Sequence, residues 1–211
     1  AGVFTVGTQW ETSLEDWRWV VGVNLMGVVH GIRSFVPRMI AQGEPAHIVN
    51  TSSMGGLITT PLSGSYGATK HAVVGISKGL RADLRIAGAA IGVSVVCPGE
   101  VATGIVEHLR ARYADGEAPP LVEATLDRLG GRLAEAGMPA DEAGRMVVTP
   151  SAAIASGSSP TPCPTSRPTG PRSPRSSDDA TRARSSPGGL EQVPAVAVEV
   201  LEDGDGGVGL V

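Results

Sequence analysis

A serine, a tyrosine and a lysine at fixed spacing are the residues of this chain best placed to do chemistry. Ser53 lies thirteen residues before Tyr66, and Tyr66 lies four residues before Lys70. If the segment 62–87 is helical, Tyr66 and Lys70 share one face, because positions i and i+4 are neighbours on a helix. The ammonium would then lower a phenol pKa that is otherwise about 10. Such a phenol can exchange a proton at neutral pH, while the serine hydroxyl holds a carbonyl or alcohol oxygen.

A Tyr-x-x-x-Lys pair alone is more often two surface residues of an ordinary helix. The serine at its offset and the apolar pattern around the pair favour the chemical interpretation here. Asn24 is a further candidate, because it falls on an apolar stripe where an amide must find hydrogen bonds. The structural alternative is that Asn24 simply satisfies freed backbone groups.

Two long helices are predicted to position these side chains. Apolar residues recur at three- and four-residue spacing over 14–41, which predicts an amphipathic helix that ends near Gln42-Gly43, with a kink at Pro37. Its stripe consists of Leu14, Trp17, Val21, Leu25, Val28, Ile32, Phe35 and Met39. The second helix, 62–87, combines an apolar stripe with a face of small residues. These small residues are Ala68, Ala72, Gly75, Gly79 and Ala82.

Two short apolar runs predict buried strands. Residues 47–52 lead into Ser53, and residues 91–97 are stopped by Pro98-Gly99. The order helix, strand, helix, strand predicts an α/β fold with a doubly wound parallel sheet. Such sheets bind ligands at the carboxyl ends of their strands, which is where Ser53 and Pro98-Gly99 fall.

The last third of the chain changes in composition. Helices are predicted over 104–114 and 121–137, and a further helix begins at 141–148 and is interrupted by Pro150. Ser, Pro, Thr and Arg then dominate with almost no large apolar residues, which is typical of disorder. The predicted organisation is therefore one domain over 1–148 and a disordered, low-complexity tail over 149–211.

Composition narrows the classes of partner. A net charge of -4 and a pI near 5.6 argue against nucleic-acid binding. Cys97 and Cys163 have no disulfide or metal-ligand context, so free thiols in a reducing, cytoplasmic compartment are expected. The histidines form no pair with metal-ligand spacing, and no metal site is predicted. No apolar run is expected to reach the roughly 20 residues of a membrane span.

Together, Asn24, Ser53, Tyr66 and Lys70 resemble the catalytic set of the short-chain dehydrogenase/reductase family. The resemblance covers residues 1 to about 148 and includes the text around the four positions. That text is Ile48-Val49-Asn50-Thr51-Ser52-Ser53, Tyr66-Gly67-Ala68-Thr69-Lys70 and Pro98-Gly99-Glu100-Val101-Ala102-Thr103.

The resemblance implies a Rossmann-like fold and a role for each residue. Tyr66 would be the general acid/base, Lys70 would lower its pKa and hold the nicotinamide ribose, and Ser53 would orient the substrate oxygen. Asn24 would anchor a water in the proton relay, and Thr103 would contact the nicotinamide carboxamide. The implied cofactor-binding residues are Tyr66, Lys70, Pro98, Gly99, Val101 and Thr103. The implied chemistry is hydride transfer between NAD or NADP and an alcohol/carbonyl pair.

The chain departs from the family pattern at both ends. The Gly-rich turn that binds pyrophosphate and the residue that selects NAD or NADP are not found, and Ala1-Gly2 resembles the family segment after the fourth strand. A fragment that is truncated at its N-terminus is therefore expected. A shifted reading of the codons for 157–162 can encode Phe-Phe-Thr-His-Pro, similar to the family's continuation, so a frameshift is the preferred explanation of the tail.

The leading hypothesis is an NAD(P)-dependent oxidoreductase that acts on a small-molecule alcohol or ketone. The alternative is a truncated, non-catalytic subunit that cannot bind cofactor, and a sugar-nucleotide epimerase with the same Tyr/Lys pair is weaker. Residues 104–137 would form a substrate lid, and the helices 14–41 and 62–87 would pair in a homodimer or homotetramer.

Overall fold

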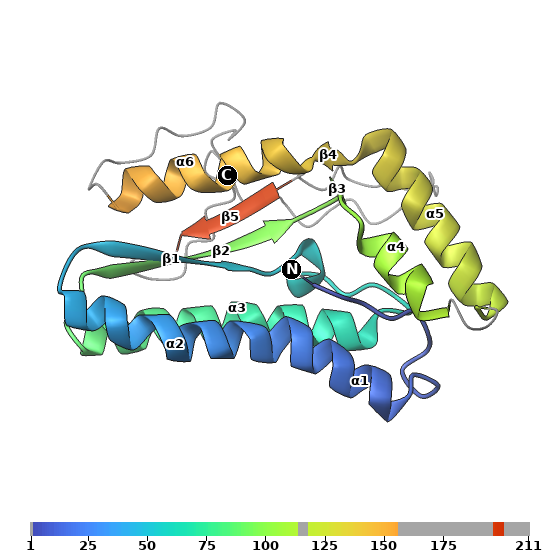
Figure 1. Ribbon diagram of the computed structural model, residues 1–211, viewed down its shortest axis with the longest axis horizontal. Helices are drawn as coiled ribbons and strands as arrows, with labels where there is room; N and C mark the ends of the chain where they lie inside the picture. Colours follow the sequence, from blue (N-terminus) through green and yellow to red (C-terminus); the bar gives the residue numbers. More distant parts are fainter. Residues whose placement is uncertain (1, 114–117, 156–195, 201–211) are drawn as a thin grey trace, which may run out of the picture.

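A small mixed sheet lies between two layers of helices (Figure 1). The computed structural model describes residues 2–113, 118–155 and 196–200. The sheet has the order β1-β2-β5, formed by β1 (Ala46–Thr51), β2 (Ile91–Pro98) and β5 (Val196–Val200). In Figure 1, α2 (Gly27–Gln42) and α3 (Gly64–Ile86) lie on one side of the sheet and α6 (Ala140–Ala155) lies on the other.

The strands β1 and β2 are parallel, in register from Ala46 beside Ile91 to Thr51 beside Val96, and α3 connects them. This arrangement confirms the predicted α/β fold with a parallel pair. Side chains of β2 alternate between the two layers, as they must in a strand. Val93 packs with residues of α2 and α3, whereas Val96 packs with residues of α6, so β2 is buried on both faces.

The strand β5 pairs antiparallel with β2, from Ser94 beside Val200 to Pro98 beside Val196. This differs from the prediction that 149–211 is a disordered tail. The sequence around β5 is rich in residues that favour strands. The edge of β2 that does not face β1 has unpaired backbone groups, so β5 can pair with it. Residues 156–195 and 201–211, which carry most of the frameshift interpretation, lie outside the described residues.

The helix α6 continues through Pro150, which was predicted to interrupt it. The predicted boundary at 148 therefore falls inside a helix. Proline removes one backbone hydrogen bond, but helices tolerate this where packing holds them. Here Ala143 and Val147 of the preceding turns pack against Val96 of β2.

The first long helix is continuous but changes type in the middle. It consists of α1 (Leu14–Val20), the π-helical segment η1 (Val21–Met26) and α2, and it ends at Gly43 in the left-handed conformation, as predicted. The apolar spacing did not predict this π-helical segment, which has a wider turn than an α-helix. The predicted apolar stripe differs from the structure at two positions.

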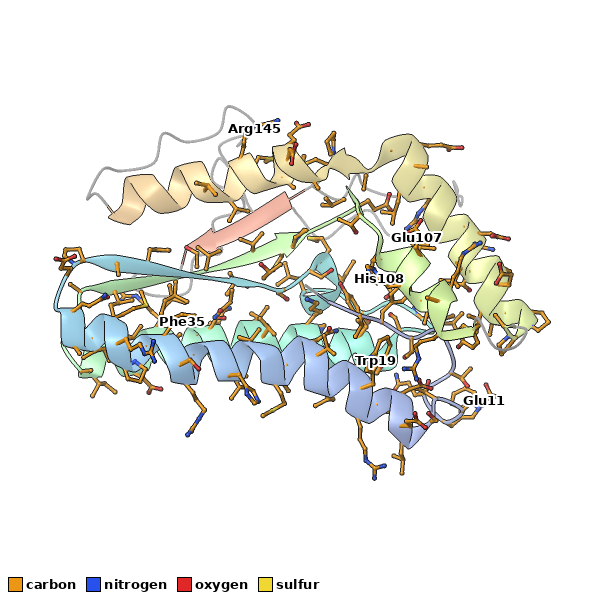
Figure 2. The ribbon with its side chains drawn as sticks, viewed as in Figure 1. Glu11, Trp19, Phe35, Glu107, His108 and Arg145 are labelled. Atoms are coloured by element: carbon orange, nitrogen blue, oxygen red, sulfur yellow. The ribbon has the colours of Figure 1, made fainter. Side chains whose placement is uncertain are left out.

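Burial along this helix departs from the predicted stripe at two positions. Val20 and Val36 are buried, whereas Leu14 and Phe35, which were placed on the buried stripe, are 71% and 64% exposed. Figure 2 shows Phe35 on this helix. Ile32 and Met39, which were also placed on the stripe, pack against the core as predicted.

The segment Leu14–Gln42 also meets the length and composition of a membrane span, with a mean hydropathy of 1.3 over an 18-residue window. This differs from the prediction that no apolar run reaches that length. A helix that packs within protein passes the same test, so composition alone assigns no membrane role. The predicted absence of a membrane partner stays a prediction.

The segment 104–137, called the lid below, contains α4 (Ile105–Arg110), the short 3-10 helix η3 (Ala111–Tyr113) and α5 (Pro120–Ala136). Two short strands flank this segment in the sequence and pair in parallel, β3 (Val101–Ala102) and β4 (Met138–Pro139). The lid packs on the extended N-terminal segment through one apolar cluster. The buried members of this cluster are Phe4, Val6, Val106, Leu109, Val122, Leu126 and Leu133.

Candidate active site around Tyr66

The candidate site lies where the parallel strands β1 and β2 end. Ser53 follows β1, and it begins the one-turn 3-10 helix η2 (Met54–Gly56) by accepting a hydrogen bond from Gly55 N–H at 3.1 Å. The Ser53 hydroxyl also donates to the carbonyl oxygen of Pro98, which ends β2, at 3.4 Å. The structure therefore brings together the two strand ends that the sequence placed at one edge of the sheet.

Tyr66 and Lys70 lie in the first turns of α3, on the face turned toward the body of the protein. Lys70 Nζ lies over the Tyr66 ring, 5.6 Å from its centroid, which confirms that the two side chains share one face. The Lys70 side chain is buried, with 3% exposure, and its ammonium donates to the carbonyl oxygen of Thr51 at 3.3 Å. The Tyr66 ring packs edge-on against Phe4, with centroids 6.3 Å apart.

The electrostatics of the pair differ from the expectation. Burial raises the pKa of the Tyr66 phenol, and a hydrogen bond with Ser53 opposes that rise. Burial also lowers the pKa of Lys70. Both shifts have the same cause, since a dry environment disfavours the charged form of each group. Tyr66 is therefore a neutral phenol at neutral pH, where lowering of its pKa by Lys70 was expected.

Asn24 occupies the middle of the π-helical segment and is 3% exposed. Its Oδ1 accepts from Val3 N–H, and its Nδ2 donates to Val3 O, both at 2.8 Å. The Nδ2 group also donates to Thr69 Oγ1 at 3.3 Å. These contacts match the structural alternative, in which the amide satisfies backbone groups, while the water-anchoring role stays a prediction.

Two residues near the site, Ser52 and Gly56, have structural roles that the sequence indicated only weakly. Ser52 donates to the carbonyl oxygen of Lys70 at 2.8 Å, which ties the loop after β1 to α3. Gly56 makes that approach possible, because a Cβ there would lie 2.7 Å from the same carbonyl oxygen. The Ser-Gly-rich composition of the loop indicated a turn but not which residues touch α3.

Phe4 is a further contributor that sequence reasoning missed. It was assigned to a loop, and it is extended but buried, with 7% exposure. Its contact with Tyr66 spans 62 positions of the chain, and no local pattern reports such a distance. The neighbouring Thr5 shares a hydrogen bond of 2.9 Å with Ser65 of α3, so this N-terminal segment is fixed along the helix that carries Tyr66.

The predicted cofactor-binding residues after β2 lie close in sequence but differ in environment. Pro98 and Gly99 are half-buried at the strand end, Val101 is half-buried in β3, and Thr103 is exposed at the base of the lid. An ammonium has three donors, and the described hydrogen bond of Lys70 uses one. Its buried position and spare donors therefore fit a ligand that brings hydroxyl groups, such as a nicotinamide ribose.

A cavity of about 350 Å³ lies at the opposite end of the sheet. Its lining includes Arg81 and Arg85 of α3 and Ile91 and Gly92 of β2. Ile91 begins β2, whereas Ser53 and Pro98 mark the strand ends at the candidate site. At the candidate site, Tyr66 packs against the apolar cluster to which residues of the lid contribute.

The family model for short chain dehydrogenases matches residues 1–114. Among curated proteins, the C alpha-dehydrogenase of Sphingobium sp. (strain NBRC 103272 / SYK-6) is 45% identical over 114 residues, which are 54% of this chain and 37% of that protein. The 1-deoxy-11-beta-hydroxypentalenate dehydrogenase of Streptomyces exfoliatus is 44% identical over 109 residues, 51% of this chain and 39% of that protein. The chain thus spans about two fifths of the length of these relatives.

Solved structures show the same fold. A short chain dehydrogenase/reductase from Burkholderia phymatum in complex with NAD superimposes with a TM-score of 0.66 at 41% identity, covering 74% of this chain and 56% of that one. A protein from Agrobacterium tumefaciens with bound NADP, assigned as a 2-deoxy-d-gluconate 3-dehydrogenase, gives a TM-score of 0.56 at 28% identity, covering 75% and 60%. By its sequence match, its fold and the positions of Ser53, Tyr66 and Lys70, this chain belongs to the short-chain dehydrogenase family.

Proposed function

We propose that this chain carries the acid/base half of an NAD(P)-dependent oxidoreductase that interconverts an alcohol and a carbonyl compound. One observation carries the proposal: half-buried Tyr66 lies beside buried Lys70, and Ser53, which affects the pKa of Tyr66, stands at the carboxyl end of a parallel strand pair. This is the edge at which doubly wound sheets bind ligands. Membership of a dehydrogenase family supports the same reaction.

Each residue has a distinct task in this proposal. Nicotinamide, when bound, supplies or accepts the hydride. Tyr66, which is neutral at neutral pH, donates its proton to the carbonyl oxygen during reduction and becomes a phenolate. In the oxidative direction this phenolate form takes the proton from the alcohol. Ser53 orients that oxygen by a hydrogen bond, and Lys70 directs its spare donors to the ribose hydroxyls.

The lid favours a substrate with an apolar surface. The lid residues of the apolar cluster on which Tyr66 packs are aliphatic, among them Val106, Leu109 and Leu126. Apolar walls with a few oriented polar groups are the usual construction of small-molecule sites. We therefore assign a hydrophobic alcohol or ketone as the substrate class.

A non-catalytic subunit is the second candidate, because the chain spans 37% and 39% of two relatives that are named as dehydrogenases. Cofactor binding separates the two candidates. NADH and NADPH are titrated against the chain while nicotinamide fluorescence is followed. Saturable binding of either one is expected for the oxidoreductase, and no binding of either would establish the non-catalytic candidate.

Turnover is then measured with a panel of apolar alcohols and ketones. Tyr66→Phe is expected to lower kcat by at least about 100-fold, since it removes the general acid/base, while cofactor affinity is retained. Tyr113→Phe is the matched control, because Tyr113 is the other tyrosine of the chain and lies in the lid. Equal losses in both variants would contradict the assignment of Tyr66.

We also propose that the chain forms a homodimer or homotetramer through the helices 14–41 and 62–87. In the 18-residue window of Leu14–Gln42 only 17% of the residues are buried, and Met26, Phe35 and Ile40 are exposed on it. Exposed apolar surface of this extent marks an interaction site. Sedimentation of the chain at several concentrations is expected to give a multiple of the 21.5 kDa chain mass.

A further inference from the structure

Arg112 joins the lid to the first long helix. Its Nη2 lies 2.6 Å from Asp16 Oδ1, across 96 positions of the chain. Its guanidinium carbon lies 4.2 Å from the centroid of the Trp19 ring. Planar guanidinium groups both pair with carboxylates and stack on aromatic faces, so one side chain makes two contacts with α1. Figure 2 shows Trp19 where α1 faces the end of α4.

The Asp16 carboxylate, which accepts from Arg112, is also oriented by a residue other than Arg112. Asp16 Oδ2 accepts a hydrogen bond from the Ser13 hydroxyl at 2.8 Å, and Asp16 N–H donates back to the Ser13 oxygen at 3.0 Å. Ser13 is the N-cap of α1. The carboxylate is therefore oriented by the cap, and both of its oxygens are used. The side chains of Asp16 and Arg112 are only 26% and 32% exposed, so water screens the pair less than it screens a surface pair.

The lid residues next to Arg112 belong to the apolar cluster on which Tyr66 packs. Leu109, one turn earlier, is 1% exposed and is part of this cluster together with Phe4. Tyr113, the next residue, packs on the same cluster, as does Tyr66. Arg112 thus fixes the end of the short segment α4–η3 beside the cluster that also holds the Tyr66 ring.

A second arginine in the same segment has a different connection. Arg110 pairs with Asp127 at 2.5 Å and with Glu123 at 3.5 Å, and both partners belong to α5 of the lid itself. Opening of the lid as a unit would leave these pairs intact. It would break the contacts of Arg112 with Asp16 and Trp19.

We propose that Arg112 is a latch that holds the lid on the apolar cluster shared with Tyr66, through its ion pair with Asp16 and its stack on Trp19, and that its release opens the site to substrate. Arg112 is a positioning residue in this proposal, because it acts through the lid. The functional meaning rests on the proposed role of Tyr66, whereas the latch itself is a property of the chain without ligand.

Hydrogen exchange tests the latch directly. In Arg112→Ala, amide exchange in 105–113 is expected to become about tenfold faster, since a stacked and paired arginine is lost. Arg110→Ala is the matched control and is expected to change exchange there by less than about twofold, because exposed ion pairs contribute little. Unchanged exchange in Arg112→Ala, or equal acceleration in both variants, overturns the proposal.

Arg112→Lys keeps the charge but loses the planar stack, so an intermediate exchange rate is expected. If Arg112→Ala does not fold, this variant decides. Exchange in 105–113 faster than in the Arg110→Ala control supports the latch, and exchange equal to that control overturns it.

Titration of Tyr66 gives a readout that a merely structural role would not move. In a Tyr113→Phe background Tyr66 is the sole tyrosine, and its ionisation is followed by ultraviolet absorbance. Burial raises the pKa of Tyr66, so adding Arg112→Ala is expected to bring it back toward 10.0, while adding Arg110→Ala leaves it unchanged. No difference between the two overturns the latch. Neither measurement needs cofactor or turnover, so an inactive chain would refute the proposed function without refuting the latch.

Discussion

The two faces of α3 differ in burial and in side-chain size. One face is buried and includes Lys70, and the other, called the open face below, is exposed and combines small residues with charged ones. The buried residues are Ser65, Thr69, Lys70, Val73, Val74, Ser77, Leu80 and Leu84. The exposed residues include Ala68, His71, Gly75, Lys78, Gly79, Ala82, Asp83, Arg85 and Ile86. The contrast predicts that substitutions on the two faces differ in their effects.

The buried face carries polar residues among apolar ones, and these polar groups are hydrogen-bonded to specific partners. Ser77 donates to Val73 O at 2.8 Å and accepts from the Asn50 amide of β1 at 2.9 Å. Ser52 donates to Lys70 O at 2.8 Å. A buried hydrogen bond that loses one partner leaves the other unsatisfied, which costs more than the bond itself contributed. The buried face should therefore respond strongly to small changes and the open face weakly.

Among substitutions near the buried face, Gly56→Ala should lower the stability of the chain most. Its Cβ would lie 2.7 Å from the Lys70 carbonyl oxygen, which as backbone cannot turn away. We expect a loss of about 3 kcal/mol in the free energy of unfolding, the upper part of the usual range for overpacking. Chemical denaturation measures it. Gly67→Ala is the control, because its Cβ meets an atom only at 3.7 Å, and equal losses would show that the contact at Gly56 is not responsible.

Asn24→Ala should have the next largest effect. It leaves the N–H and C=O of Val3 without their partner and frees the N-terminal segment that lies along α3. A loss of about 2 kcal/mol in unfolding free energy is expected. Val23→Ala, on the exposed side of the same turn, should cost much less. A loss of comparable size at Val23 would mean that the turn, and not the amide, is what matters.

Lys70→Met should stabilise the chain at neutral pH by about 1 kcal/mol, because it replaces a buried charge with an apolar side chain of similar volume. The pKa of Lys70 is lowered on folding, so the unfolded chain binds more protons between the folded value and the ordinary 10.5. Wild-type stability therefore rises with pH through that window. The advantage of the variant should be complete below the folded pKa and disappear toward pH 10.5.

Thermal unfolding of both proteins across this pH range is the measurement. An advantage that stays constant with pH would show that packing, rather than the ammonium, accounts for the difference.

Gly75→Ala should have the smallest effect and the opposite sign from Gly56→Ala. A Cβ at Gly75 meets nothing within 4 Å, and alanine favours a helix over glycine by about 0.5–1 kcal/mol. Gly131→Ala in α5 should gain a similar amount, since its surroundings are equally open. If the open face of α3 is an interface, only Gly75→Ala should also weaken self-association in sedimentation. Equal association in both variants would argue against that interface.

The sequence predicted what depends on local spacing. Tyr66 and Lys70 fall on one face because α3 is a regular helix at that point. The strands β1 and β2 were recognisable because a strand that is buried on both faces is apolar throughout. Ser53 reaches Pro98 because parallel strands end at the same edge of the sheet.

What the sequence did not predict depends on distant contacts. The direction of the Tyr66 pKa shift follows from burial, to which Phe4 and the lid contribute from far away in the chain. The pairing of β5 with β2 links segments about a hundred residues apart. Val36 rather than the predicted Phe35 is buried, because Val36 is the residue that meets α3 and β2. The π turn η1 was not predicted from the apolar spacing either.

That π turn also affects how this chain should be aligned with other proteins. Each residue of an α-helix advances the side-chain direction by about 100°, so one additional residue in a turn rotates everything beyond it by that amount. A relative with an unbroken α-helix here would match the faces of α1 and α2 only if one residue were treated as an insertion near Asn24. An ungapped alignment would pair buried residues with exposed ones on one side of that point.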